Sequence, residues 1–135
     1  IQKSKFTISS KQDFDTFIKK SAKTSFKNKE TWEEKFYNHR VIVIFWDEKS
    51  EFFKDFILKL PVLVTKWFSQ NVWIKLAASN IEWINLKDYK IDKLPSLVVF
   101  ENEAYLKTIW EEEKIQKLVK SLNLDINKLI DDFDN

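Results

Sequence analysis

The stretch Val41-Ile42-Val43-Ile44-Phe45-Trp46 decides how this chain is built. All six side chains are apolar, and the first four branch at the β-carbon, which favours extended backbone. An apolar run without polar alternation is typical of a strand covered on both faces, as in the parallel sheets of α/β proteins. We therefore expect residues 41–46 to form a central strand, with helices on both sides of its sheet.

A long helix is expected directly after this strand, over residues 51–68. Its apolar residues recur at helical spacing and form one face: Phe53, Phe56, Ile57, Leu60, Val64 and Trp67. Pro61 lies inside the segment, where it removes one backbone hydrogen bond and is expected to kink the helix. The apolar face of this helix should cover the central strand.

The remaining elements follow from the same patterns. Further strands are expected at 6–8, 72–77, 96–100 and 105–110. Helices are expected from Ser9 or Ser10, at 30–37, at 81–89, from Glu111 and in the tail after Asn123. The last two strands should form a hairpin whose tight turn needs a positive φ. Because the chain has no glycine, Asn102 is the residue expected to adopt it.

Composition sets the class of protein. The 135 residues are 44% hydrophobic and 33% charged, as in an ordinary globular domain, and their number predicts one domain, 1–135. The net charge is only +2, with both signs interspersed, so no nucleic-acid face is indicated. No apolar run approaches the roughly 18 residues of a membrane-spanning helix. The lack of glycine, the single arginine and the six tryptophans suggest an AT-rich genome, of the mollicute type.

Two segments together resemble the thioredoxins. The first ends in Phe45-Trp46, where the family has Phe-Trp followed a few residues later by Cys-Gly-Pro-Cys-Lys. The second runs from Tyr89 to Asn102 and contains Leu94-Pro95-Ser96-Leu97. The family has Ile/Val-Pro-Thr-Leu there, then two hydrophobic residues, Phe, a variable residue and Asn. The resemblance spans approximately Phe6 to Leu122.

That resemblance implies the fold class. It is α/β, a thioredoxin-like three-layer α/β/α sandwich with a mixed central sheet. Residues 22–38 would be a helical insertion after the first helix, and the residues after 122 a short C-terminal extension.

The chemistry of that family is absent, because the chain contains no cysteine. Counted from Phe45-Trp46, the two cysteine positions hold Ser50 and Phe53, and one turn further on they hold Phe53 and Phe56. Thiol–disulfide exchange needs an attacking thiolate, and a serine attacks only beside an activating base. The single histidine, His39, precedes the opposite end of the central strand. We therefore expect no catalytic residue and a redox-inactive, non-enzymatic domain.

No cofactor or metal is expected either. One histidine and no cysteine exclude the usual zinc sites. Asp131, Asp132 and Asp134 lack the spacing of a calcium-binding EF-hand loop. Without glycine the chain cannot form the phosphate-cradling loops of nucleotide-binding proteins.

One candidate site remains, and it too is implied by the resemblance. In thioredoxin-like folds, the loop after the central strand and a loop bearing a cis-proline line a groove that binds extended peptide. The corresponding residues are Trp46, Ser50, Phe52, Phe53, Leu94 and Pro95, with a cis bond expected between the last two. Exposed aromatics there would mark a binding patch. The alternative is that Phe52 and Phe53 are buried by the insertion or the tail.

The sequence therefore predicts a redox-inactive thioredoxin-like domain that acts as a protein-binding or structural module. Two alternatives stay open: a domain that binds a thiol cofactor such as glutathione beside Pro95, and a chaperone-like holdase that uses the aromatic groove. The expected partner is a protein or peptide. Because the chain opens with Ile1 rather than a methionine, we expect processing and an extracytoplasmic location, secreted or membrane-anchored. The oligomeric state is not predicted.

Overall fold

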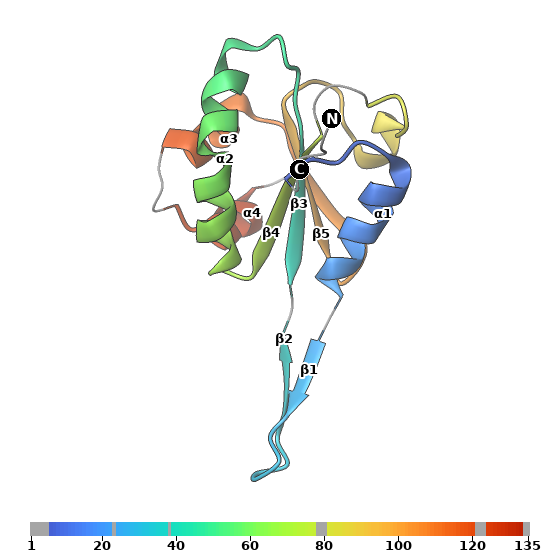
Figure 1. Cartoon of the computed structure of the whole chain (residues 1–135), viewed down its shortest axis with the longest axis vertical. Helices are drawn as coiled ribbons and strands as arrows, with labels where there is room; N and C mark the ends of the chain where they lie inside the picture. The colour runs from blue at the N-terminus through green and yellow to red at the C-terminus, as the bar shows by residue number, and fades with distance from the viewer. Residues whose placement is uncertain (1–5, 23, 38, 78–80, 121–123, 134–135) are drawn as a thin grey trace.

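A mixed four-stranded sheet forms the centre of the molecule (Figure 1). The computed structural model describes residues 6–22, 24–37, 39–77, 81–120 and 124–133. The strand order is β4-β3-β5-β6, with β3 parallel to β4, and with β5 antiparallel to both β3 and β6. The strands are β3 (Arg40–Phe45), β4 (Val72–Ala77), β5 (Ser96–Glu101) and β6 (Ala104–Ile109). The predicted run at 41–46 is therefore a central strand, as expected.

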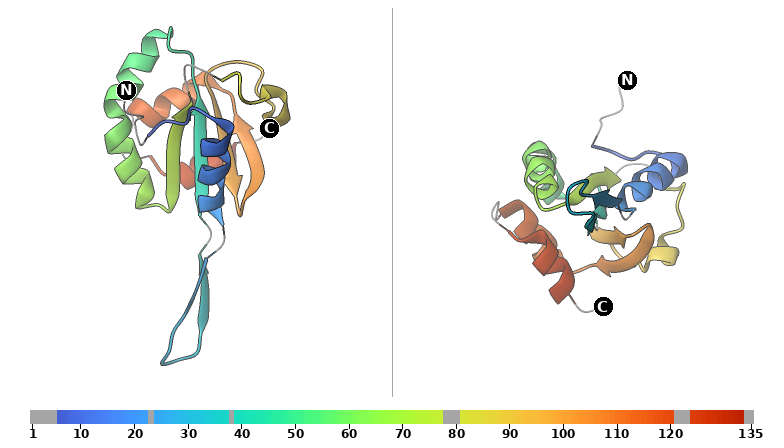
Figure 2. Two further views of the ribbon diagram at one scale, coloured as in Figure 1. Left: turned by 45° about the vertical axis from the view of Figure 1, so that its right-hand side comes forward. Right: turned by 90° about the horizontal axis from the view of Figure 1, so that it is seen from below.

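Helices cover both faces of the sheet, which confirms the three-layer architecture (Figures 1 and 2). One face is covered by α1 (Lys11–Ile18), with the short 3₁₀ helices η1 (Lys19–Ser21) and η2 (Leu86–Tyr89). The other is covered by α2 (Glu51–Phe68), α3 (Glu112–Lys120) and α4 (Ile126–Asp132). Within the described part of the chain, no helix has both the length and the apolar character needed to cross a membrane.

The central strand supplies both cores, since successive side chains of a strand point to opposite faces. Ile42 and Ile44 pack with α2, α3 and α4, whereas Val41, Val43 and Phe45 pack on the α1 side. All five side chains are fully buried. This explains why the run shows no polar alternation.

Most predicted elements appear within a residue or two of their expected bounds. Residues 51–68 and 72–77 form α2 and β4 with the expected limits. The first helix is capped by Ser10, whose hydroxyl accepts a hydrogen bond from the Asp13 amide at 3.1 Å. The segment 81–89 is helical only in its last turn, η2, because Asn85 caps it late and Lys90 adopts a left-handed conformation directly after it.

The prediction of a helix at 30–37, and with it a helical insertion at 22–38, is wrong. Residues 24–37 contain an antiparallel hairpin of β1 (Thr24–Lys27) and β2 (Glu34–Tyr37), which projects away from the three layers (Figure 1). The four-residue spacing of Trp32 and Phe36 indicated a helix, but residues 25–35 are all exposed, so no helix face is buried there. The Asn28 side chain accepts from the Glu30 amide, and Trp32 turns the chain with a φ of 61°.

The turn between β5 and β6 contains two residues with positive φ: Asn102 at 54°, as expected, and also Glu103 at 64°. Both amides are held by buried Ser21, whose carbonyl accepts from Asn102 and whose hydroxyl accepts from Glu103. A left-handed conformation costs any residue with a β-carbon, and glycine avoids that cost.

We therefore expect Glu103→Gly to stabilise the protein by about 0.5–1 kcal/mol, after allowance for glycine's greater freedom when unfolded. The measurement is the urea midpoint at constant slope. Glu103→Ala is the control and should give no gain, since alanine retains the β-carbon. An equal gain in both variants would contradict the backbone explanation.

Candidate functional site

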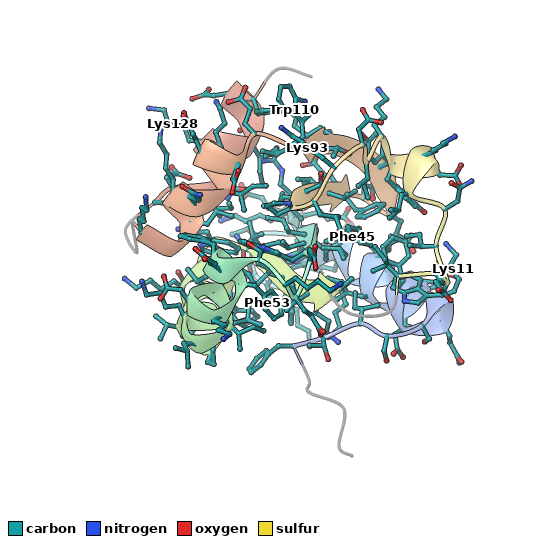
Figure 3. All side chains as sticks on the ribbon, turned by 90° about the horizontal axis from the view of Figure 1, so that it is seen from above. Lys11, Phe45, Phe53, Lys93, Trp110 and Lys128 are labelled. Atoms are coloured by element: carbon teal, nitrogen blue, oxygen red, sulfur yellow. The ribbon has the colours of Figure 1, made fainter. Side chains whose placement is uncertain are left out.

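The six predicted groove residues all lie near one end of the sheet. Phe45, the last residue of β3, pairs with Ser96, the first residue of β5. Trp46 and Pro95 are the next residues outward on these two strands. The loop from Trp46 then leads into α2 at the same end. Figure 3 looks onto this end, with Phe45 near its centre and Phe53 on α2.

Trp46 is buried beneath the surface at this end of the sheet and does not line an exposed groove. Its side chain is 1% exposed and stacks on Phe52, with ring centroids 6.0 Å apart and an interplanar angle of 16°. The rings of Phe53 and Phe56 pack around it at 6.4 and 4.7 Å. Phe52 and Phe53 are half-buried, so part of each ring faces solvent. The outcome lies between the two alternatives, since these rings are neither fully exposed nor fully covered.

The first turn of α2 is held by backbone rather than by side-chain caps. Ser50 precedes the helix without a side-chain cap, and its carbonyl accepts from the Phe53 amide at 3.1 Å. The Ser50 amide donates to the Asp47 carbonyl at 3.0 Å. These two backbone hydrogen bonds fix the loop that leads into α2.

The Leu94–Pro95 segment contributes backbone groups to the site. The peptide bond between the two residues is cis, and Pro95 is buried while Leu94 is half-buried. The Ser96 hydroxyl donates to the Lys93 carbonyl at 2.6 Å, which holds the start of β5. Among the described residues, the N–H and C=O of Leu94 have no hydrogen-bond partner. Leu94 therefore offers one donor and one acceptor beside Pro95.

Two residues at this end were missed by the sequence prediction. The Lys93 ammonium lies 5.0 Å from the ring centroid of Trp110, which is 43% exposed (Figure 3). Together with Glu111, Glu112 and Glu113 they line a hollow of about 420 Å³. Trp110 directly follows β6, and Ile109 pairs with Leu97 near the start of β5. That strand pairing brings Trp110 to this end, and it could not be inferred from Trp110 alone.

Solved structures with the same arrangement identify the fold. No protein-family model matches the sequence, and no curated protein matches it either. Thioredoxin from Plasmodium falciparum superposes with a TM-score of 0.54 at 14% identity, covering 90% of this chain and 100% of that one. The germline-specific thioredoxin Deadhead from Drosophila melanogaster gives 0.54 at 14%, covering 86% and 97%. Fasciola hepatica thioredoxin gives 0.53 at 10%, covering 84% and 95%.

The fold is that of the thioredoxins. At these identities the likeness shows the fold alone, and the chemistry follows from this chain's own residues. Because the chain has no cysteine, this thioredoxin-like domain lacks the family's Cys-x-x-Cys motif and the thiol–disulfide exchange that depends on it. Both counts from Phe45-Trp46, the one to Ser50 and Phe53 and the one to Phe53 and Phe56, end on residues without a thiol.

The single histidine of the chain lies away from this end. His39 directly precedes β3 and so lies at the opposite end of the strand. Among the described residues, no group of three or more His, Cys, Asp or Glu side chains is arranged to hold a metal ion. The candidate site therefore consists of aromatic rings, one free backbone pair and flanking charges.

The protein should not accelerate the reduction of insulin by dithiothreitol, since it has no thiolate to attack the disulfide. Turbidity should develop at the rate seen without protein. The positive control is Ser50→Cys/Phe53→Cys, which places two thiols at the N-terminus of α2, where a thiolate is favoured. Clear acceleration by the unmodified chain would contradict the prediction.

Proposed function

We propose that this thioredoxin-like domain is a redox-inactive protein-binding module that holds an extended peptide segment at the end of the sheet, beside Leu94. The observation that carries the proposal is that the N–H and C=O of Leu94 have no hydrogen-bond partner in the part of the chain that the structure describes. A half-exposed residue with both backbone groups free can pair with one residue of an extended chain, as an edge strand does.

The surroundings of Leu94 support the same role. The half-buried rings of Phe52 and Phe53 and the 43% exposed ring of Trp110 provide apolar contact area for side chains of the segment. At this end, exposed acidic residues outnumber the exposed lysines Lys49, Lys54 and Lys93: Asp47, Glu48, Glu51, Glu112 and Glu113. A segment that carries basic as well as apolar residues would therefore be favoured over an acidic one.

The test begins with selection of twelve-residue peptides from a random display library on the purified domain. A selected peptide is then titrated while the backbone amide signals are followed by NMR. We expect the Leu94 amide to be among the most strongly shifted. Methylating the peptide nitrogens should abolish binding, because it removes the donors that pair with the Leu94 carbonyl.

Two tryptophan variants provide matched arms of this test. Trp110→Ala should weaken binding by about five- to tenfold, since exposed aromatics are frequent hot spots. Trp32→Ala is the control, because Trp32 is 73% exposed on the hairpin, away from this end (Figure 1). Failure to select any peptide, or shifts confined to other regions, would overturn the proposal in favour of a purely structural module.

The free backbone pair of Leu94 would also accept the cysteinyl unit of glutathione, which is itself a short peptide. A titration with reduced glutathione therefore belongs in the same experiment. Saturable shifts at Leu94 with glutathione, but with none of the selected peptides, would favour a cofactor-binding domain. Suppression of the aggregation of an unfolded protein, lost in Trp110→Ala, would instead favour a holdase.

A further inference from the structure

Helix α2 carries apolar side chains on its outer face as well as on its buried face. The buried ones fill the core beside the sheet: Phe56, Leu60, Leu63 and Trp67. Four further apolar side chains are between 37% and 79% exposed: Ile57, Leu58, Val62 and Phe68. The helix lies at the periphery of the molecule in both views of Figure 2. An exposed apolar surface of this kind is typical of a face that meets a protein partner.

Helical spacing arranges part of this surface in one row. Successive residues of an α-helix lie about 100° apart around its axis, so residues three and four apart lie above one another. Leu58, Pro61 and Thr65 therefore form a row along α2, and Val62 adjoins it on one side. All four residues are exposed. We call them the outer stripe of α2, which is uncharged along about two turns.

The two flanks of the outer stripe differ in character. One flank is apolar and contains Ile57 and Phe68, which the same helical spacing places on one side of the row. The other flank is charged. Asp55 lies near its N-terminal end and Lys66 near its C-terminal end, and Lys59 pairs with Asp55 at 3.4 Å. The difference between the flanks, and the order of the charges along the helix, restrict what can pack on the stripe.

A mainly apolar groove of about 450 Å³ lies beside the C-terminal half of α2. Val64 and Phe68 line it from α2, and Trp73 lines it from β4 and meets Phe68 edge-on at 4.8 Å. Lys20 and Lys75 line it further from α2. Because Phe68 belongs to the apolar flank, a side chain that arrives along this flank meets the groove.

We propose that the outer stripe is a self-association site, at which α2 packs antiparallel on α2 of a second copy around a two-fold axis at Pro61. The site lies on the outer face of α2, so it is separate from the peptide site proposed at Leu94. In a two-fold pair of this kind, residues equally far before and after Pro61 lie opposite each other. Leu58 of one copy therefore inserts between Pro61 and Thr65 of the other, as a knob enters a hole between packed helices.

The flanks favour the antiparallel orientation. A two-fold axis perpendicular to the helices brings the same flank of each helix together, whereas a parallel pair brings opposite flanks together. In the antiparallel pair apolar flank meets apolar flank, and Ile57 of one copy meets the groove of the other beside Val64 and Phe68. A parallel pair would instead place Lys59 and Lys66 against Ile57 and Phe68. That arrangement removes water from ammonium groups without supplying a partner, which costs free energy.

On the charged flank, the antiparallel order brings opposite charges together. Asp55 lies six residues before Pro61 and Lys66 five residues after it, so Asp55 of each copy faces Lys66 of the other. Lys54 lies at the start of the stripe, opposite Phe68 of the other copy, and an ammonium over an aromatic face is attracted to it. This surface is thus complementary to itself in shape, apolar character and charge, which identifies a second copy as its occupant.

The length of the face determines how strong the association is. The 18 residues of α2 span about 27 Å, so the contact belongs to the small interfaces that associate weakly. We expect a reversible dimer with a Kd of about 100 μM, measured by sedimentation equilibrium from about 10 μM to 1 mM. Leu58→Glu should weaken it at least tenfold, whereas Phe26→Glu, at a 64% exposed position on the hairpin, should not. A natural chain that stays monomeric at 1 mM would leave the face to a different protein and overturn the proposal.

Single cysteines report the orientation of the two helices, because the natural chain has none. Leu58→Cys mixed with Thr65→Cys should form the mixed disulfide faster than either variant forms a disulfide with itself, since only the mixed pair comes within disulfide distance. Mass spectrometry of samples oxidised for increasing times measures the three rates. Phe26→Cys is the control and should crosslink only at the rate of random collision. Faster disulfides within each single variant would show parallel packing, and equal rates for all pairs would show no defined packing, and either result would overturn the proposal.

Charge reversal separates specific association from loss of fold. Asp55→Lys and Lys66→Asp should each weaken self-association about tenfold, because each brings like charges together across the pair. An equimolar mixture of the two variants should associate as strongly as the natural chain, since each copy then carries the charges that complement the other. A mixture no tighter than either variant alone would overturn the proposal. Peptide binding at Leu94 should be unchanged in Leu58→Glu, so the two proposed sites hold or fail independently.

Discussion

Replacing Trp46 by alanine is expected to destabilise the protein by about 3–5 kcal/mol, the usual cost of removing a large buried aromatic side chain. The indole is 1% exposed, and its ring meets those of Phe52, Phe53 and Phe56. Truncation removes three ring contacts at once and leaves a cavity at the end of the sheet. Chemical unfolding followed by far-UV circular dichroism measures the change.

Trp46→Phe is the matched control and should cost under about 1.5 kcal/mol, since it keeps most of the buried apolar volume. The indole Nε1 is buried and has no hydrogen-bond acceptor among the described residues. Phenylalanine therefore loses no hydrogen bond and removes a polar atom that costs free energy to bury. An alanine variant within 1 kcal/mol of the natural chain would show that this aromatic cluster does not hold the loop.

The same residue illustrates which parts of the fold could be predicted from sequence. The run from Val41 to Trp46 has one consistent signal, because burial on both faces and β-propensity favour the same structure. The helix at 51–68 was equally clear, despite Pro61, because its apolar spacing extends over five turns. The insertion at 24–37 had no such support. Residues 25–35 are all exposed, so the four-residue spacing of Trp32 and Phe36 did not belong to a helix packed on a core.

The candidate sites were predictable only in part. The resemblance to thioredoxins implied that Trp46 and Pro95 lie together, at the ends of two buried strands expected to share a sheet. The resemblance implied free backbone groups beside Pro95, but it did not tell which residue carries them. That residue, Leu94, depends on which hydrogen bonds the rest of the chain leaves unmade, and only the three-dimensional arrangement determines that.

Arg40, the single arginine of the chain, connects β3 with β5 and α4, which lie far apart in the sequence. From the start of β3, its Nε donates to Glu101 at the end of β5 at 3.4 Å. Its Nη1 donates to the Asn127 side chain at 3.2 Å, and its Nη2 meets an Asp131 carboxylate oxygen at 2.7 Å. Both of the latter partners belong to α4. The Arg40 side chain is only 15% exposed, so these contacts are partly shielded from water.

Arg40→Ala is expected to cost about 1.5–3 kcal/mol, the range for hydrogen bonds made by a charged donor. We expect no larger loss of stability because Asp131 is 59% exposed, so its carboxylate is hydrated by water when Arg40 is removed. The loss should concentrate on α4, whose other polar contacts include the bond from the Ile126 amide to the Gln70 side chain. Hydrogen exchange in α4 should therefore accelerate more than exchange in β3.

Arg40→Lys separates charge from geometry. An ammonium group is a single point charge, and it cannot reach Glu101, Asn127 and Asp131 together as the planar guanidinium does. We expect lysine to recover less than half of the lost stability and to leave exchange in α4 fast. Full recovery by lysine would mean that Arg40 acts through charge alone. Exchange that accelerates equally in β3 and α4 would mean that the C-terminal helix unfolds only with the whole domain, and that Arg40 does not hold it separately.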